Sequence, residues 1–177
     1  MKNDLKRRTL VLATVTVGLS AGLLFGYQVS VIPAFKTLSD REYIAAFQAL
    51  NVAIQNPIFF LCYMGAAIFA LWTAYLHKGE PASRKSKLLG MAAGLYLATI
   101  VITLGANVPL NNKLAAFPLK SATPEQQAAF RTDFEGPWNT WHLLRTLTSM
   151  GSLALLVLVC ASPTDEHKGL KPKKEDR

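Results

Sequence analysis

The chain has 177 residues, of which 51% are hydrophobic and only 17% are charged. A single soluble domain could have this length, but the apolar residues gather in long uncharged blocks that soluble cores rarely contain. The net charge of +8 does not indicate a nucleic-acid-binding protein, because the basic residues are spread over several segments and no DNA-binding motif is present. The composition therefore favours an integral membrane protein without a nucleic-acid partner.

Four apolar blocks predict four membrane-spanning helices, because a span needs about 20 mostly apolar residues. We expect an all-α, integral membrane four-helix bundle over residues 9–161, with two helical extracytoplasmic loops. Residues 1–8 then form a basic N-terminus, and the Lys-rich tail 162–177 is expected to be disordered. The expected spans are at about 9–31, 57–77, 88–106 and 141–161.

The distribution of Lys and Arg predicts the orientation of the bundle. Of the 19 basic residues, 13 lie in the two ends and between the second and third spans, and five lie in the two long loops. Cytoplasmic segments of membrane proteins carry an excess of Lys and Arg. We therefore expect both termini in the cytoplasm, a location in the plasma (inner) membrane, and contact between the basic ends and membrane lipids.

Small residues recur every four positions in the first and third spans, as Gly18, Gly22 and Gly26 and as Gly90, Gly94 and Ala98. Such stripes let membrane helices approach closely. We expect the first and third spans to pack through them. A seam between two copies of the chain, giving a homo-oligomer, is the alternative.

The loop after the first span contains a helix-start pattern at Ser39–Glu42, a capping box. On the predicted helix the amides of Gln48, Asn51 and Gln55 share one face. This face either lines a cavity or is a wet surface. Asn56-Pro57 then fits a helix N-cap followed by the first helical residue, or a kink in a continuing helix.

Prolines predict where the later helices end. We expect the third span to stop at Asn107-Val108-Pro109, since proline ends helices and asparagine favours turns. A second capping pattern, Thr123 with Gln126, predicts a helix in the next loop that ends before Gly136-Pro137.

A ring of polar groups is predicted at one depth. Arg145 precedes 16 uncharged residues, about 24 Å of helix, whereas a bilayer core is about 30 Å thick. Arg145 should therefore lie inside the outer edge of the hydrocarbon, where a charge usually faces a partner or a wet cavity. Counting inward from the basic flanks puts Gln28, Asn56 and Asn107 at the same level. The alternative is a ring of interface residues that hydrogen-bond loop backbone.

Further residues of interest surround Arg145 in sequence. His142 is three positions earlier, on a neighbouring part of the same helix face. Trp138 and Trp141 are expected at interfacial height. No established catalytic motif and no metal-ligand spacing of His or Cys is present, so we expect neither a metal nor another cofactor. Cys62 and Cys160 are expected near opposite membrane faces, unpaired.

Three segments carry a resemblance to a known family. They are residues 48–57 (Gln-Ala-Leu-Asn-Val-Ala-Ile-Gln-Asn-Pro), 107–114 (Asn-Val-Pro-Leu-Asn-Asn-Lys-Leu) and 138–145 (Trp-Asn-Thr-Trp-His-Leu-Leu-Arg). In this order they resemble the anthrone-oxygenase-like family of small integral membrane proteins, over roughly residues 9–161. The resemblance implies four membrane helices and, from some fungal members, oxidation of anthrones to anthraquinones. Asn107, Asn111 and Arg145 match the family pattern, whereas the position of His142 is often Asn there.

Two hypotheses follow. In the first, the protein oxidises an apolar aromatic small molecule with oxygen. Arg145 and Asn107 would stabilise an enolate oxygen, and His142, or else Asp133 or Glu135, would accept the proton. In the second, the same bundle is a non-catalytic module that binds a lipid or apolar ligand or supports a membrane complex. In both, the expected ligand-binding residues are Gln28, Gln48, Asn51, Gln55, Asn56, Asn111, Trp138 and Trp141.

Overall fold

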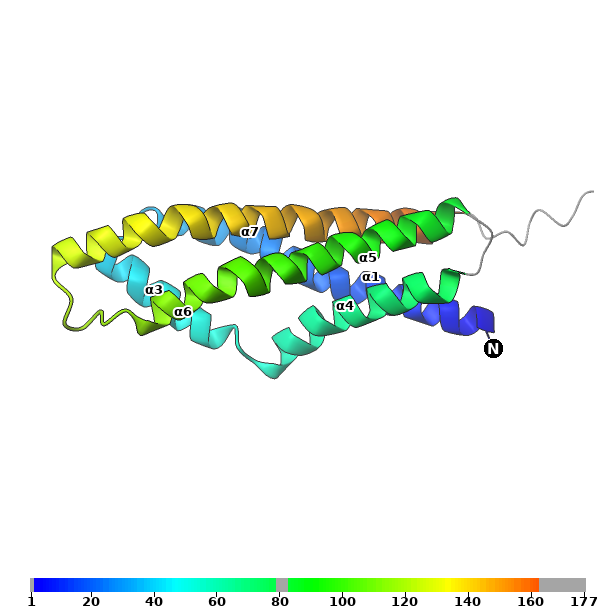
Figure 1. The fold of residues 1–177 in the computed structure, drawn as a ribbon, viewed down its shortest axis with the longest axis horizontal. Helices are drawn as coiled ribbons and strands as arrows, with labels where there is room; N and C mark the ends of the chain where they lie inside the picture. The colour runs from blue at the N-terminus through cyan, green and yellow to red at the C-terminus, as the bar shows by residue number, and fades with distance from the viewer. Residues whose placement is uncertain (1, 79–82, 163–177) are drawn as a thin grey trace, which may run out of the picture.

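The structure, a computed structural model, describes residues 2–78 and 83–162. All regular structure in these residues is helical (Figure 1). In chain order the elements are α1 (Lys2–Gly26), the π-helical turn η1 (Tyr27–Val31), α2 (Ile32–Phe35), α3 (Asp40–Ala53), α4 (Pro57–His77), α5 (Arg84–Ile102), the π-helical turn η2 (Thr103–Asn107), α6 (Val108–Ala116) and α7 (Pro124–Ala161).

Four of these helical rods are long and apolar enough to cross a membrane: Asn3–Phe35, Pro57–His77, Arg84–Ala116 and Pro124–Ala161. The prediction of four candidate spans in an all-α protein is confirmed. Helix α1 packs against α4 and α7, and α5 packs against the same two helices. Helices α1 and α5 are therefore diagonal to each other, and the expectation that the first and third spans pack together is wrong.

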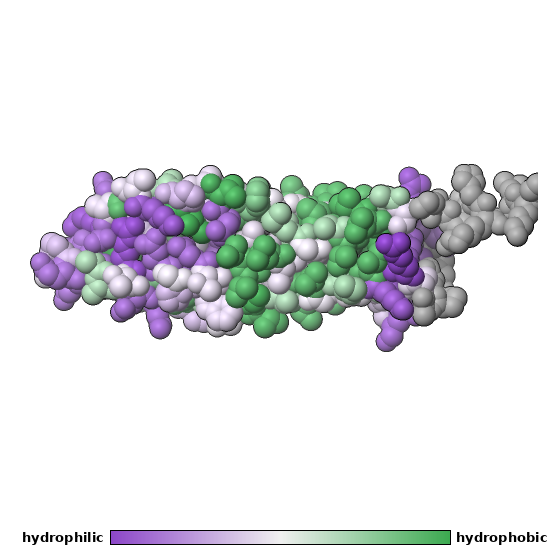
Figure 2. Space-filling view, turned by 90° about the horizontal axis from the view of Figure 1, so that it is seen from above, coloured by the Kyte–Doolittle hydropathy of each residue, from purple (hydrophilic) through white to green (hydrophobic). Residues whose placement is uncertain are grey.

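The two ends of the bundle differ. Helix α1 begins and α7 ends at one end, here called the terminal end (Figure 1). The other end, here called the loop end, contains α2, α3, α6 and the first turns of α7. A hydrophobic band lies between two hydrophilic zones, and the zone at the loop end is the deeper (Figure 2). The bundle thus extends beyond the apolar band at the loop end.

The apolar band has the height of a bilayer core. On α7, exposed large apolar side chains extend from Trp141 to Leu158, which is about 27 Å of helix. Along α1 and η1 the main run extends from Val11 to Val29, a similar length, and Leu5 is also exposed nearer the N-terminus. The hydrocarbon core of a bilayer is about 30 Å thick. Arg145 is about 6 Å inside the loop-end edge of this band, in agreement with the depth expected from the sequence.

Prolines do not end the helices where the sequence predicted. The rod of α5 continues through η2 and Pro109 to Ala116, and α7 continues through Pro137. A proline lacks the N–H for the helical ladder and its ring crowds the preceding turn. The wider π-helical turn before Pro109 makes room for the ring. In α7 the carbonyl left without its donor belongs to Asp133, an exposed residue at the wet loop end.

The two π-helical turns have the same relation to a proline. Each has five residues and ends two positions before a proline, at Val31 before Pro33 and at Asn107 before Pro109. In the first, the Ser30 hydroxyl also donates to the Gly26 carbonyl. Turns of this kind change the direction of the side chains that follow, and they occur frequently at functional sites.

The helix starts of the loop end were predicted correctly. Ser39 and Thr123 both form capping boxes, with Glu42 and Gln126 as the reciprocal partners. The hydrogen bonds from Ser39 lower the pKa of the exposed Glu42 carboxyl below its usual value. Asn56 caps α4 by accepting from the Phe59 N–H, so of the two alternatives for Asn56-Pro57 the N-cap is confirmed.

An arginine clamps the loop end together. Arg131 of α7 donates to Asp40 at 3.1 Å, to Glu135 at 2.8 Å and to the Leu38 carbonyl at 2.8 Å. Its guanidinium also lies 4.4 Å from the ring centre of Tyr43. These contacts hold the start of α3 against α7, over a core that is mostly aromatic: Ile32, Tyr43, Ile44, Phe47, Leu114, Phe134 and Trp138.

The close helix approach in the membrane band is between α5 and α7. The Ser152 hydroxyl donates to the Ala92 carbonyl at 2.8 Å, and a Cβ added to Gly151 would meet Leu95 Cδ1 at 3.2 Å. Gly22 is exposed instead, and a Cβ there would meet no atom within 4 Å. Gly151 therefore has the tightest surroundings. Of the stripe on α1, Gly22 and Gly26 face open space, and a Cβ on Gly18 would make ordinary contact with Leu153 Cδ1 of α7, at 3.6 Å.

This difference predicts opposite outcomes for one substitution at two glycines. Gly151→Leu should force α5 and α7 apart and lower the free energy of unfolding by about 1–3 kcal/mol, the usual cost of overpacking. Gly22→Leu, the matched control, should leave the melting temperature in detergent unchanged. Equal melting temperatures for the two variants would contradict this packing of α5 on α7.

Candidate functional site

The guanidinium of Arg145 lies where all four spans meet. From α7 it donates through Nε and Nη2 to His142 Nδ1, at 3.2 and 2.9 Å. Its Nη1 reaches Thr103 Oγ1 of η2 at 3.5 Å, a long hydrogen bond. Its central carbon lies 5.4 Å from the ring centre of Trp138. Helix α1 contributes the Leu24 carbonyl, which bonds His142, and α4 contributes the Tyr63 hydroxyl, which bonds Thr103.

The hydrogen bonds of His142 define its protonation state. The side chain is fully buried, and Nε2 lies 3.2 Å from the Leu24 carbonyl of α1. Because Nδ1 accepts from the guanidinium, the ring is neutral and carries its hydrogen on Nε2, which donates to that carbonyl. The lone pair of Nδ1 is thus the one basic site of the ring, and Arg145 covers it.

Trp138 lies at the centre of the side chains around Arg145, here called the Arg145 cluster, and only 3% of it is exposed. Its ring stacks on His142 with centroids 4.8 Å apart and planes 9° apart. Tyr27 of η1 lies against both rings, 5.5 Å from Trp138 and 5.1 Å from His142. Trp138 Nε1 donates to Asn111 at 2.7 Å, and Asn107 Nδ2 donates to the Trp138 carbonyl at 3.4 Å.

A hydroxyl pair lies on the far side of the guanidinium from His142. Thr103 Oγ1 donates to the Thr99 carbonyl at 2.8 Å. Since Thr103 uses its hydrogen there, the Tyr63 hydroxyl of α4, which is 2.5 Å away, donates to Thr103 Oγ1. Both residues are buried. The guanidinium is therefore held between a neutral imidazole and a neutral hydroxyl pair.

Arg145 has no carboxylate partner among residues 2–78 and 83–162. Glu135, which could have supplied one, pairs with Arg131, and Asp133 is exposed. A guanidinium has five N–H groups, of which three make the contacts above. The site thus has a charge within the apolar band and spare donors that an anionic oxygen would satisfy.

Buried oxygens without a hydrogen-bond partner occur on both π-helical turns. They are the hydroxyl of Tyr27, Oε1 of Gln28 and Oδ1 of Asn107. Leaving a buried polar atom unpaired typically costs about 1–3 kcal/mol. Three more such oxygens, on Ser20, Tyr43 and Thr73, lie elsewhere in the described residues. Asn107 is fully buried, and its other contact, the 3.4 Å bond to the Trp138 carbonyl, is weak.

Other residues proposed from the sequence have different surroundings. Gln48 donates to the Leu114 and Phe117 carbonyls and so fastens α3 to the end of α6. Gln55 is exposed and bonds the carbonyl of the half-buried Asn51. Asn56 is the exposed cap of α4, and Trp141 lies in the exposed apolar band. Of the predicted polar ring, Asn107 and Arg145 both contact Trp138, one through its carbonyl and the other over its ring. Gln28 lies beside Tyr27 in η1.

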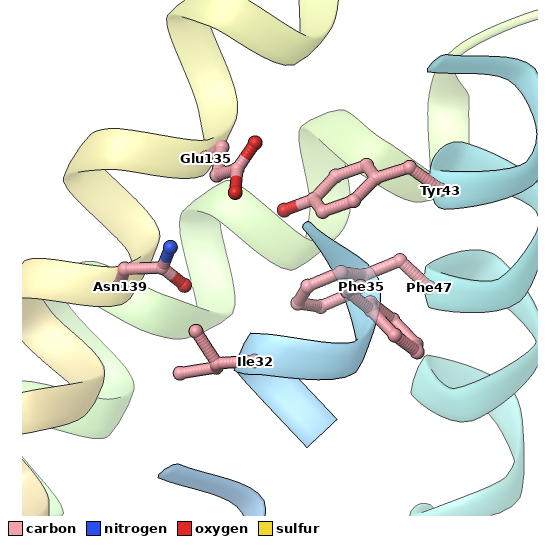
Figure 3. A pocket seen from close by; sticks show the side chains of 6 residues that line it. All are labelled: Ile32, Phe35, Tyr43, Phe47, Glu135 and Asn139. Atoms are coloured by element: carbon pink, nitrogen blue, oxygen red, sulfur yellow. The ribbon is translucent and has the colours of Figure 1, made fainter. Parts of the chain in front are cut away.

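A small hollow lies beside the cluster, one layer nearer the loop end. It has no room for even a water-sized sphere, and Ile32, Phe35, Tyr43, Phe47, Glu135 and Asn139 line it (Figure 3). Ligand pockets for drug-sized molecules usually have about 300–1,000 Å³. This hollow is therefore too small for a tricyclic aromatic, and the Arg145 cluster has to widen to admit one.

Metal ligation has no visible basis in the described part of the chain. No group of three or more His, Cys, Asp or Glu side chains gathers there in a way that could hold an ion. Cys62 and Cys160 are both free thiols.

Sequence reasoning missed three residues of the cluster: Tyr27, Tyr63 and Thr103. One signal could have found two of them. The first residue of each π-helical turn, Tyr27 or Thr103, lies six positions before a proline in an otherwise uninterrupted apolar segment. Tyr63 carries no local signal, because it reaches the site only through the packing of α4 on α5.

Asn107 offers a test of whether the cluster is built for stability. Asn107→Leu removes a weak hydrogen bond and an unpaired buried oxygen while keeping the number and branching of the side-chain heavy atoms, so we expect an unchanged or higher melting temperature in detergent. A fall of more than about 5 °C, which corresponds to about 1–2 kcal/mol at this chain length, would show that Asn107 is structural.

Comparison with known proteins identifies a family. Residues 59–155, more than half of the chain, match the family described as anthrone oxygenase. The matched region contains Tyr63, Thr103, Asn107, Asn111, Trp138, His142 and Arg145. No curated protein and no solved structure matches the chain. On the match to more than half of its length, the chain belongs to the anthrone oxygenase family.

Proposed function

We propose that this protein uses molecular oxygen to oxidise an apolar phenolic or polyketide-like molecule of the anthrone type, at the Arg145 cluster. The observation that carries the proposal is a guanidinium within the apolar band that has no carboxylate partner in the described residues and that contacts a neutral imidazole. A site of this kind stabilises negative charge that develops on a bound oxygen. Family membership supplies the class of reaction.

The reaction needs no group beyond substrate, oxygen and these side chains. Loss of a proton from the methylene carbon opposite the ring carbonyl gives an electron-rich enolate. That carbon transfers electrons to oxygen and forms a C–O bond, which gives a hydroperoxide once a proton returns. Loss of water from the hydroperoxide leaves the second carbonyl of the anthraquinone. One methylene and one O₂ thus become one carbonyl and one water.

Three residues have roles in this scheme. Arg145 donates to the carbonyl oxygen that becomes the enolate oxygen, and Asn107 Nδ2 is a second donor of the cluster. His142 Nδ1 accepts the methylene proton. In the unliganded structure Arg145 occupies that nitrogen. Binding of the substrate oxygen to the guanidinium therefore exposes the base only when a substrate is present.

The mutual pairing of Arg145 and His142 also supports a second candidate function. A module that binds an apolar carbonyl compound without turning it over needs the guanidinium but no accessible base. Both functions predict binding that depends on Arg145. Only the oxygenase predicts consumption of oxygen and loss of activity in His142→Phe, which has no basic nitrogen.

Two arginines on α7 allow a matched test of the oxygenase. Arg145→Lys keeps the charge but loses the planar fork, so we expect a folded protein whose turnover of an anthrone falls by about 100-fold or more. Arg131→Lys breaks the clamp on Asp40 and Glu135, so we expect a lower melting temperature and unchanged turnover per folded molecule. Oxygen uptake and anthraquinone absorbance in lipid nanodiscs, corrected for empty nanodiscs, measure turnover.

The opposite pattern would reject the proposal. If Arg145→Lys unfolds the protein and Arg131→Lys loses turnover, Arg145 is the structural residue. If wild-type protein binds an anthrone but consumes no oxygen above the empty-nanodisc rate, the binding module is the better account.

We also propose that both termini face the cytoplasm, with the loop end and the Arg145 cluster on the outer side of the plasma membrane. The excess of Lys and Arg near the terminal end supports this orientation. Reporter fusions placed after Arg177 and within residues 117–122 should report the cytoplasmic and the outer side, respectively. The reverse assignment, or both fusions on one side, would contradict it.

A further inference from the structure

Beyond the side chains that act on substrate, we propose that Thr103 and Tyr63 are positioning residues that set the direction of the Arg145 guanidinium. This inference rests on the proposed function. Neither hydroxyl has a role in the chemistry above, yet both are buried at the far side of the guanidinium from His142.

The geometry makes Thr103 a directed acceptor. Its hydrogen is committed to the Thr99 carbonyl at 2.8 Å, and the Tyr63 hydroxyl donates to it at 2.5 Å. The remaining lone-pair region of Thr103 Oγ1 faces Nη1 of Arg145 at 3.5 Å. Tyr63 in turn is fixed by its ring, which stacks on Phe59 at 5.1 Å. The acceptor is therefore locked in place by α4 and α5, not by α7.

The long contact to Thr103 suits a guanidinium that has to turn. A substrate oxygen must draw Nε or Nη2 away from His142 Nδ1, or the base stays covered. While that happens, the hydroxyl pair of Thr103 and Tyr63 continues to hold the Nη1 side of the guanidinium. The guanidinium then pivots about Nη1 toward the substrate instead of moving freely, and the distance between enolate oxygen and base is kept. Misplacing a catalytic group by about 1 Å can cost about 100-fold in rate.

The arrangement also explains why a π-helical turn begins at Thr103. Thr103 and Asn107 open and close η2, and both are buried toward the cluster. One turn thus presents an acceptor to Arg145 and an amide to Trp138.

Thr103→Val removes the acceptor without changing the shape of the side chain. We expect kcat for an anthrone to fall about 10- to 100-fold with KM nearly unchanged, because Thr103 does not contact the substrate. Thr103→Ser keeps Oγ and should retain kcat within about threefold of wild type. Tyr63→Phe frees Thr103 Oγ1 to rotate, so its kcat should lie between those of Thr103→Val and Thr103→Ser.

The matched control is Thr99→Val, one turn earlier on α5. Thr99 Oγ1 contacts Thr148 and backbone carbonyls, including that of Arg145, but not the guanidinium. We expect Thr99→Val to lower the melting temperature and to leave kcat per folded molecule unchanged. A purely structural role for Thr103 would give Thr103→Val this same result, without rescue by Thr103→Ser.

The outcomes separate this inference from the proposed function. Full kcat in Thr103→Val together with loss of turnover in Arg145→Lys overturns the positioning role and leaves the oxygenase intact. A raised KM with full kcat in Thr103→Val assigns Thr103 to substrate contact and also overturns it. Wild-type protein without turnover overturns both. Binding of an anthraquinone, followed by quenching of tryptophan fluorescence, should weaken in Arg145→Lys and stay unchanged in Thr103→Val.

Discussion

The structure depends on one constraint, a guanidinium inside an apolar bundle that has no opposite charge beside it in the described chain. Removing a charge from water is costly unless its donors are satisfied, and a carboxylate would be the ordinary solution. Here Arg145 uses an imidazole nitrogen and a threonine hydroxyl. Each of these acceptors is itself held by hydrogen bonds from the other three spans. The Leu24 carbonyl of α1 bonds His142, and the Tyr63 hydroxyl of α4 and the Thr99 carbonyl of α5 bond Thr103. Two carboxylates of the loop end, Asp40 and Glu135, are meanwhile committed to Arg131.

The two π-helical turns place these supports at one depth. In α1 and α5, which are diagonal to each other, a five-residue turn ends two positions before a proline. The first residues of the turns, Tyr27 and Thr103, approach the same cluster from opposite sides, one against His142 and one against Arg145. A proline in a regular α-helix would either end it or kink it. The wider turn lets the rod continue to the loop end while the polar groups stay at the edge of the apolar band.

Local patterns predicted the spans, the caps and the depth of Arg145, because uncharged length, a capping residue and a basic flank are each readable within about 20 residues. The course of the helices through Pro109 and Pro137 could not be read this way. Whether a proline stops a helix depends on a π-helical turn before it or on water at the freed carbonyl. A proline in an apolar segment shows where such a turn can lie, but not whether it forms. The glycine stripes led to the wrong prediction that the first and third spans pack together. Their spacing shows that the small residues share a helix face, but it does not show which helix packs on that face.

The site was predicted in part, for a related reason. Arg145, His142, Asn107 and Trp138 follow from depth and from their nearness in sequence. Tyr63 and Thr103 depend on the order of the helices around the bundle, in which α4 and α7 are diagonal and Arg145 reaches across the interior between them. Asn56 was expected at the mouth from its depth, and Gln48 was expected on a helix face that lines a cavity or is a wet surface. In the structure Asn56 caps α4, and Gln48 donates to the Leu114 and Phe117 carbonyls.

The central claim is that Arg145 and His142 ionise a bound carbonyl compound before oxygen reacts with it. The most direct measurement is the absorption spectrum of an anthrone mixed with the purified protein in nanodiscs without oxygen at neutral pH. The account predicts the red-shifted absorption of a bound enolate in wild-type protein and its absence in Arg145→Lys, followed by anthraquinone when oxygen is admitted. An anthrone that stays un-ionised on wild-type protein, or ionises equally on Arg145→Lys, would contradict it.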